Sequence, residues 1–289
     1  MNSRGIELPH IMELFGKTRV VVKDGKVVEV GEPVADWCPV FSKFSNVSRL
    51  TADEAKKNME YRIRELGMFT PQRRFDYGVF VNFGASEIMM TALARGLIDS
   101  TVTVCDGAGT VITDNPSLVQ GMGALMSGLI ETEPIEEIIV GIEARGGFVL
   151  DRENAGIDQA GGLIKACELG FKKIAVSVVS PEEAGKLRLI EKENDIDLIL
   201  IGAHLTGIKC REAEELIQKM DIITGCASNM VRRLIHPLLQ AGASVPVFAM
   251  TRKGKELIIE RAKEIDSPIL VSTAELPVLP EHKQPRPLR

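Results

Sequence analysis

The stretch that decides the fold is KIAVSVVSPEEAGKLRLIEKENDIDLILI, residues 173–201. Its first part, Lys173–Val179, is mostly apolar and β-branched, as in a strand that is buried on both faces. Ser180 is a good helix N-cap, and the proline and two glutamates after it favour a helix over Pro181–Glu193. A second apolar run, Leu198–Ile201, follows. Strand, helix and strand at this spacing predict a right-handed crossover between parallel strands.

The same alternation continues on both sides of this stretch. The sequence predicts helices over Gln159–Leu169, Arg211–Lys219, Ser228–Gln240 and Lys253–Ile265, and strands over Ile222–Thr224, Val245–Ala249 and Pro268–Val271. Most of these strands are short and apolar on both faces, which is typical of a sheet covered by helices on both sides. We therefore expect an α/β fold with a mostly parallel sheet, in a Rossmann-like three-layer arrangement with helices on both faces.

The N-terminal half is less regular, but one local signal in it is clear. Within TRVVVKDGKVVEVG, residues 18–31, two valine-rich runs flank Asp24-Gly25, a pair that suits a tight β-hairpin turn. Weaker signals predict a helix after Thr51 and short strands over Val79–Val81, Thr101–Cys105 and Ile138–Ile142. The chain then divides into an N-terminal α/β part with the hairpin and cysteine- and glycine-rich loops (1–156), a regular repeat part (157–275) and a disordered tail rich in proline (276–289).

Composition narrows the range of functions. The 289 residues carry a net charge of −5, only 4% are aromatic, and the basic residues form no block, so nucleic-acid binding is not expected. Apolar runs such as Leu198–Ile201 are too short to span a membrane, and Met1–Leu14 has no apolar signal core. We therefore expect a cytoplasmic protein that does not enter a membrane. Its five cysteines would be free thiols there, or ligands of a metal or cluster.

Three chemically versatile side chains come at the ends of predicted strands. Cys105 ends the run TVTVC, and His204 and Cys226 each follow an apolar run and a glycine. Ligands of open parallel sheets bind beyond the carboxyl ends of the strands, so we expect these side chains along one edge. With Cys38, which lies in an irregular loop beside a proline, they could hold zinc or anchor an iron–sulfur cluster. The competing interpretation is that each cysteine is a small buried hydrophobe, since the chain has no CxxC pair.

The loop DGAGT, residues 106–110, offers a second kind of site. Successive backbone N–H groups of a glycine-rich turn can cradle a phosphate or another anion, here within Asp106, Gly107, Gly109 and Thr110. Neither the dinucleotide-binding fingerprint nor the Walker pattern is present. A tight turn that needs glycine explains the loop equally well. No motif in the chain names a reaction, so the catalytic residues stay unassigned.

Five strings resemble those of the methanogenesis marker protein 8 family, whose function is not known: GKTRVVVKDGKVVEVGEP (16–33), DWCP (36–39), VCDGAGTVI (104–112), LVQGMG (118–123) and TGCASNMVR (224–232). The likeness covers most of the chain and implies a cytoplasmic archaeal protein tied to methanogenesis or a neighbouring process. Members of the family carry further cysteines where this chain has Phe69 and Ala108. The resemblance thus implies a cysteine-rich site that is partly lost here, leaving Cys38, Cys105 and Cys226.

Three functional hypotheses follow. The first is an accessory protein that handles a metal or iron–sulfur cluster in the assembly or activation of methanogenesis enzymes, with Cys38, Cys105, Cys226 and His204 as ligands. The second is an enzyme that acts on a small anionic substrate at the carboxyl edge of the strands, with Cys105 as nucleophile. The third is an assembly factor without catalysis, which binds a protein partner of methanogenesis or a related anaerobic pathway through the hairpin and loops.

Overall fold

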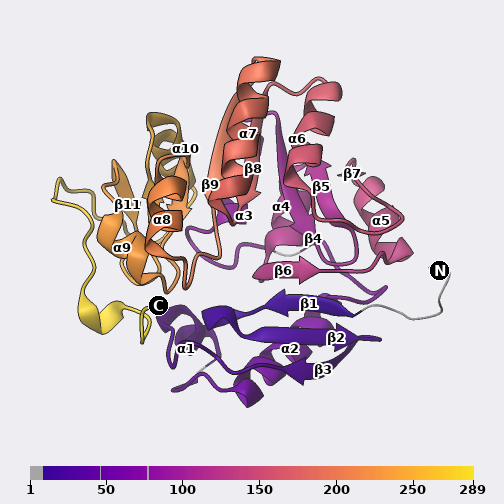
Figure 1. Cartoon of the computed structure of the whole chain (residues 1–289), viewed down its shortest axis with the longest axis horizontal. Coiled ribbons are helices and arrows are strands. Elements are labelled where there is room, and N and C mark those ends of the chain that lie inside the picture. Colours follow the sequence, from indigo (N-terminus) through magenta and orange to yellow (C-terminus); the bar gives the residue numbers. More distant parts are fainter. Residues whose placement is uncertain (1–8, 46, 77) are drawn as a thin grey trace.

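The computed structural model describes residues 9–45, 47–76 and 78–289. It contains two sheets, a small one below and a large one above in the view of Figure 1. The small sheet is antiparallel, with the order β3-β2-β1-β6, and consists of β1 (His10–Glu13), β2 (Arg19–Lys23), β3 (Lys26–Val30) and β6 (Gly128–Glu131). The large sheet has the order β11-β12-β10-β9-β8-β4-β5-β7.

The large sheet is mixed, so the prediction of a mostly parallel sheet is wrong. Its centre is parallel and consists of β4 (Ser100–Cys105), β8 (Lys173–Val178), β9 (Asp197–Gly202) and β10 (Ile222–Thr224). Its margins are antiparallel, with β5 (Gly109–Thr113) and β7 (Phe148–Val149) on one side and β12 (Val247–Ala249) and β11 (Leu239–Ala241) on the other. Short apolar strands such as β10 and β12 carry no sequence signal for their direction, because both of their faces are buried in either case.

Helices cover both faces of the large sheet. One core joins alternate residues of β8 and β9 to α6 (Gln159–Glu168), α7 (Pro181–Asn194), α8 (Cys210–Ile217) and α9 (Asn229–Leu234). The opposite core joins the intervening residues to α3 (Ala85–Ala94) and α10 (Arg252–Ala262). A third core lies between β5, β7, α4 (Pro116–Gly123) and α5 (Glu136–Glu143). In the described part of the chain, no helix is both long and apolar enough to cross a membrane.

Four predicted elements take another form. Ile138–Ile142 lies inside α5 and not in a strand, because two glutamates in the first turn favour the helix despite the β-branched residues. Val79–Val81 and Pro268–Val271 lie outside the strands of the structure. The helix predicted over Ser228–Gln240 ends at Leu234, because a proline shortly after that residue cannot continue it.

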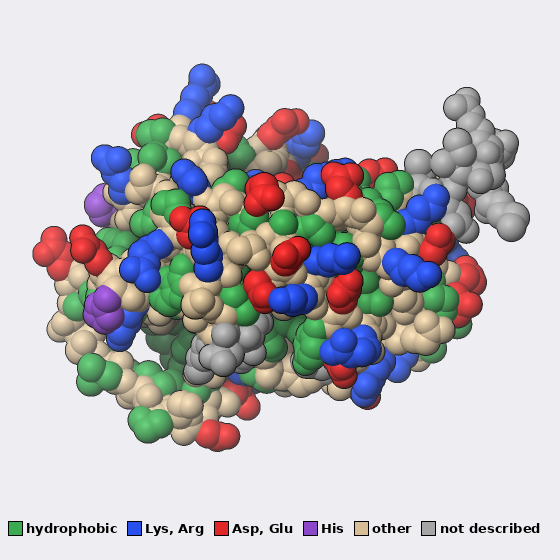
Figure 2. Space-filling view, turned by 90° about the horizontal axis from the view of Figure 1, so that it is seen from below, with side chains coloured by type: hydrophobic (Ala, Val, Ile, Leu, Met, Phe, Trp, Pro, Cys, Tyr) green, Lys and Arg blue, Asp and Glu red, His purple; other side chains and the backbone are tan. Residues whose placement is uncertain are grey.

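The predicted hairpin is confirmed as β2 and β3. Asp24 and Gly25 form its turn with φ of 50° and 66°, the left-handed pair that a two-residue hairpin turn favours. The hairpin is followed by α1 (Pro39–Ser45) and by α2 (Ala52–Leu66), which begins after Thr51 with a side-chain hydrogen bond to the first turn. Acidic and basic side chains are interspersed on the face that looks downward in Figure 1 (Figure 2).

The C-terminal segment, residues 276–289, lies against the body of the molecule instead of forming a disordered tail. It includes a short 3-10 turn, Glu281–Lys283, and the buried Gln284. Arg286 forms an antiparallel bridge with Trp37, which gives the backbone of the segment partners that composition alone does not reveal. The large sheet contains strands from both the N-terminal part (1–156) and the repeat part (157–275) of the chain. The boundary at residue 156 therefore does not coincide with a boundary between the two sheets.

His10 on β1 makes the stability of the fold depend on pH. Burial lowers its pKa below the ordinary value of about 6.5, and its Nδ1 accepts a hydrogen bond from the backbone N–H of Glu133 at 3.2 Å. As the pH falls, the imidazole of His10 is therefore protonated at a higher pH in the unfolded chain than in the folded protein. The free energy of unfolding is at its maximum above about pH 6.5 and decreases as the pH drops towards the pKa of the folded state. Urea unfolding between about pH 7.5 and about pH 5 should show this loss, and His10→Gln should reduce it. An equal loss in that variant would contradict the assignment to His10.

Candidate functional site

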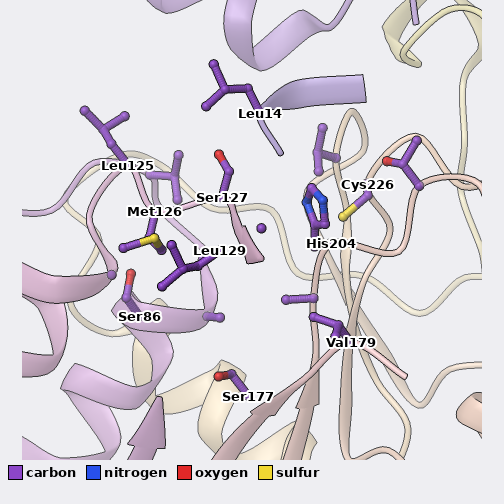
Figure 3. A pocket seen from close by; sticks show the side chains of 18 of the residues that line it. Leu14, Ser86, Leu125, Met126, Ser127, Leu129, Ser177, Val179, His204 and Cys226 are labelled. Carbon is purple, nitrogen blue, oxygen red and sulfur yellow. The ribbon is translucent and has the colours of Figure 1, made fainter. Parts of the chain in front are cut away.

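A cavity of about 450 Å³ lies between the two sheets. One wall comes from the carboxyl ends of β4, β8, β9 and β10, and the other from β6, α1, the first turn of α3 and the chain after β1. Figure 3 shows Ser86, Leu125 and Met126 on one side and His204 and Cys226 on the other. The site therefore lies where the parallel centre of the sheet predicts a ligand.

Two residues at the strand ends have an unusual backbone. His204 follows β9 with φ of 57°, and Cys226 follows β10 with φ of 40°. A left-handed backbone costs energy in residues other than glycine and is found disproportionately at functional sites. Ile223 pairs with Gly202 across these parallel strands, and the Thr224 hydroxyl donates to the Gly202 carbonyl at 3.1 Å. The two side chains therefore start from adjacent positions at one edge of the sheet.

A hydrogen bond between the sheets holds the imidazole of His204. Its Nε2 lies 2.8 Å from Oε2 of Glu13 at the end of β1. This bond is the main cause of the lowered pKa of Glu13, and the charge of Lys17 adds to it. Gly128 on β6 leaves room for the ring, because a Cβ at that position would lie 2.4 Å from the imidazole Nε2. A larger residue at position 128 would therefore displace His204 from Glu13.

One end of the cavity carries the side chain of Arg62 from α2. The buried guanidinium donates to the carbonyl of Leu125 and to the hydroxyl of Ser127, the latter at 3.2 Å. Burial lowers the pKa of Arg62 to about 9, which leaves it charged at neutral pH. This end of the cavity is therefore positive.

The cavity also carries two thiols, Cys38 before α1 and Cys226 after β10. Burial raises the pKa of Cys38, and hydrogen bonds from the backbone of Phe41 and Val40 oppose the rise. The charge of Cys226 adds a smaller increase, and that of Arg232 on α9 a smaller decrease. Arg232 is 5% exposed and donates to the backbone carbonyls of Cys226 and Ser244 and to the side chain of Gln284. Burial lowers the pKa of Arg232 to about 10. The two thiols thus share one buried cation.

The four predicted metal ligands do not come together. Cys38, His204 and Cys226 line the cavity, whereas Cys105 is fully buried in the core of α4 and α5, with its sulfur 3.8 Å from Oδ1 of Asp106. Cys105 ends the first strand of the β4–β5 hairpin, whose buried turn covers it. Among the residues described, no group of three or more His, Cys, Asp or Glu side chains is placed to hold a metal ion. The predicted set therefore does not fit zinc or an iron–sulfur cluster.

The DGAGT loop is a buried turn instead of an anion cradle. The N–H of Gly107 donates to the hydroxyl of Thr132 at 2.8 Å, and that of Thr110 donates to a backbone carbonyl at 3.0 Å. The carboxylate of Asp106 pairs with a buried arginine. Gly107 and Gly109 have φ of 76° and 68°, so the requirement for glycine in the turn explains both of them.

Two charged residues of the site, Glu13 and Arg62, lie outside every motif of the sequence, and a third, Arg232, ends the string TGCASNMVR but was not predicted as a site residue. Glu13 and Arg62 reach the site through contacts between segments that are distant in the chain, because Glu13 lies 191 positions from His204 and Arg62 lies 63 positions from Leu125. The one sequence feature that could have pointed to such residues is an isolated charge within or beside apolar residues, as in the run HIMEL that contains Glu13. Such a charge is more often solvated than functional, so the signal has little specificity.

A family model described as an uncharacterized protein conserved in archaea (DUF2099) matches residues 10–263. The chain is also 45% identical, over 282 residues, to the uncharacterized protein MJ0054 of Methanocaldococcus jannaschii, an alignment that covers 96% of this chain and 99% of that protein. The elements from β1 to α10, which build most of the cavity, lie within the family match.

Proposed function

The chain belongs to this archaeal family, DUF2099, and we propose that it binds a small, largely apolar organic molecule in the cavity between its sheets. The observation that carries the proposal is the position of the cavity, at the carboxyl ends of the parallel strands. Side chains such as Leu14, Leu129 and Val179 would contact the body of the ligand, and the few polar groups would orient it.

The charges in the cavity indicate the polarity of this ligand. The charged lining residues are Arg62, Glu87 and Glu183. The carboxylate of Glu87 already accepts hydrogen bonds from two backbone N–H groups and from Gln120, whereas the guanidinium of Arg62 suits an acidic group, which it would bind by charge-assisted hydrogen bonds. We therefore propose a molecule with an apolar body and an acidic group. Cys105 has no part in its chemistry, because it lies outside the lining and burial raises the pKa of its thiol well above the ordinary range.

We place this binding activity in an accessory role in methanogenesis or a neighbouring anaerobic process in the cytoplasm. The support is the resemblance of DWCP and TGCASNMVR, which contain Cys38 and Cys226, to the methanogenesis marker protein 8 family. The 45% identical protein from Methanocaldococcus jannaschii also places the chain among archaeal proteins. A protein partner would receive the ligand or its product. Metal handling is not included, because the predicted ligands do not converge.

A fluorescent probe with an apolar body and one acidic group, 1-anilinonaphthalene-8-sulfonate, tests the cavity directly. Ala203 lines the cavity beside β9, so Ala203→Phe would fill part of it. This variant should bind the probe about tenfold more weakly, which corresponds to about 1.4 kcal/mol. Fluorescence titration measures the dissociation constants.

Ala94→Phe provides the matched control, because Ala94 is exposed on α3 and lies away from the lining. It should bind the probe as the wild-type protein does. Urea unfolding of both variants identifies any loss of structure, which by itself increases binding of this dye. Equal affinity of the wild type and of a folded Ala203→Phe variant would contradict the cavity as the binding site. The hypothesis of an assembly factor that binds only a protein partner would then be the better one.

A further inference from the structure

We propose that Cys38 and Cys226 form a redox-active dithiol that exchanges with a disulfide substrate in the cavity. The two thiols come from different parts of the fold, one from the loop before α1 and the other from the loop after β10. Binding of the substrate rests on the proposed function, whereas the dithiol itself can be tested without the natural ligand. The experiments on the cavity and on the dithiol can therefore fail separately.

The C-terminal segment attaches the two thiol loops to each other. On one side, the N–H of Trp37 donates to the carbonyl of Arg286 and the N–H of Arg286 donates back to Trp37, both at 2.9 Å. On the other side, the N–H of Arg289 donates to the carbonyl of Ala227 at 2.8 Å. The residue before the first thiol and the residue after the second are therefore bonded to the same short segment. Figure 1 shows the chain end between α1 and α9.

Arg232 supplies a positive charge beside both sulfurs. Its guanidinium donates to the carbonyl of Cys226 and to the side chain of Gln284, while its Nε has no hydrogen-bond partner among the described atoms. Its three acceptors are uncharged oxygens, and it forms no ion pair with a carboxylate among the residues described. A cation without a carboxylate favours the thiolate, which is the nucleophilic form of cysteine.

Cys226 is also held in position within the site. The hydroxyl of Thr224 lies 3.3 Å from its Sγ, and its left-handed backbone at the end of β10 is the kind of strain that persists when the surrounding structure imposes it. Figure 3 shows the sulfur of Cys226 at the cavity, next to the side chain of His204. Of the other three cysteines, Cys105 is fully buried, Cys167 is half-buried on α6 and Cys210 is exposed on α8, and none of them lines the cavity.

The reaction is an ordinary thiol–disulfide exchange in two steps. The thiol of Cys226 loses its proton to water, and its sulfur attacks one sulfur of the substrate disulfide. This forms a mixed disulfide and releases the first substrate thiolate, which takes up a proton. The thiol of Cys38 then loses its proton and attacks the sulfur of Cys226, which releases the second substrate thiol. Two cysteines are oxidised to one disulfide, one substrate disulfide is reduced to two thiols, and a dithiol reductant resets the protein.

Oxidised glutathione serves as the probe disulfide. Full-length protein is incubated with it and then digested without reductant for mass spectrometry. We expect a peptide pair joined by a bond between Cys38 and Cys226, with the intact mass lowered by two hydrogen atoms. Cys38→Ser should instead accumulate glutathione on Cys226, from a trace in the wild type to most of the protein. Cys210→Ser, the matched control at the surface, should behave as the wild type does.

Three results would overturn the proposal: glutathione that remains on Cys226 in the wild type, a bond that involves Cys210, or no reaction at either Cys38 or Cys226. Urea unfolding of Cys38→Ser and Cys226→Ser shows whether these variants keep the fold, and 1-anilinonaphthalene-8-sulfonate reports the cavity of the wild-type protein. An intact dithiol in a protein that fails to bind the dye would contradict the cavity proposal alone. Normal dye binding without the disulfide would contradict the dithiol alone.

Discussion

Replacing Asp106 with alanine is expected to lower the free energy of unfolding by about 3–5 kcal/mol. Its carboxylate accepts hydrogen bonds from Nε of Arg73 at 2.9 Å and from the N–H of Phe69 at 2.7 Å, and neither charged side chain is exposed. Alanine would leave the guanidinium of Arg73 buried without a counter-charge. Burying an unpaired charge destabilises the fold strongly, even though an intact buried ion pair is often no more stabilising than a pair of apolar side chains in its place. Equilibrium unfolding in urea, followed by circular dichroism, measures the loss.

A surface pair next to Arg73 in the sequence provides the control. Asp76 lies 3.6 Å from Arg74 with both side chains exposed, so Asp76→Ala should cost less than about 1 kcal/mol. Replacing both buried charges, in the double variant Arg73→Met and Asp106→Leu, should recover much of the stability lost in the single variant. A loss in Asp106→Ala as small as that in Asp76→Ala would mean that the buried pair does not stabilise the turn.

Local signals decided which elements of the fold could be predicted. Ser180-Pro181 predicted the start of α7 and Asp24-Gly25 predicted the hairpin, because caps and turns depend on residues only a few positions apart. The direction of β12 was not predictable. Its residues, Val247–Ala249, are buried on both faces, and the direction depends on the path of the chain after α9. Mixed pairing at the margins of the sheet is therefore a long-range property.

The rule that ligands bind at strand ends located part of the site. It brought His204 and Cys226 to one edge, and both line the cavity. It failed for Cys105, because the chain turns back at once into β5 and the turn is buried. The bond between His204 and Glu13 joins residues 191 positions apart, and no local pattern encodes such a pair. Strand ends can thus be found from sequence, but which of them are open depends on the tertiary contacts around them.

Replacing Arg232 with methionine is expected to slow the second step of the exchange, in which Cys38 attacks the mixed disulfide on Cys226, by about threefold at neutral pH. Burial raises the pKa of Cys38, and the charge of Arg232 opposes that rise together with the larger effect of the backbone groups of Phe41 and Val40, so removal of Arg232 would raise the pKa further. The thiolate fraction falls about tenfold for each unit of this rise while the pH stays below the pKa. The pH profile of the rate at which glutathione leaves Cys226, followed from about pH 6 to about pH 9.5, should therefore shift to higher pH and approach the wild-type rate at the alkaline end.

Two further variants separate the charge of Arg232 from its packing. Arg232→Lys keeps the charge and should restore most of the rate at neutral pH, whereas Arg233→Met removes the exposed neighbouring charge and should leave the profile unchanged. Because Arg232 also donates to Gln284 and to the carbonyl of Cys226, its loss could instead disturb the thiol loops. A disturbance of that kind would lower the rate by the same factor at every pH. Such a profile for Arg232→Met, without rescue by lysine, would contradict the electrostatic role.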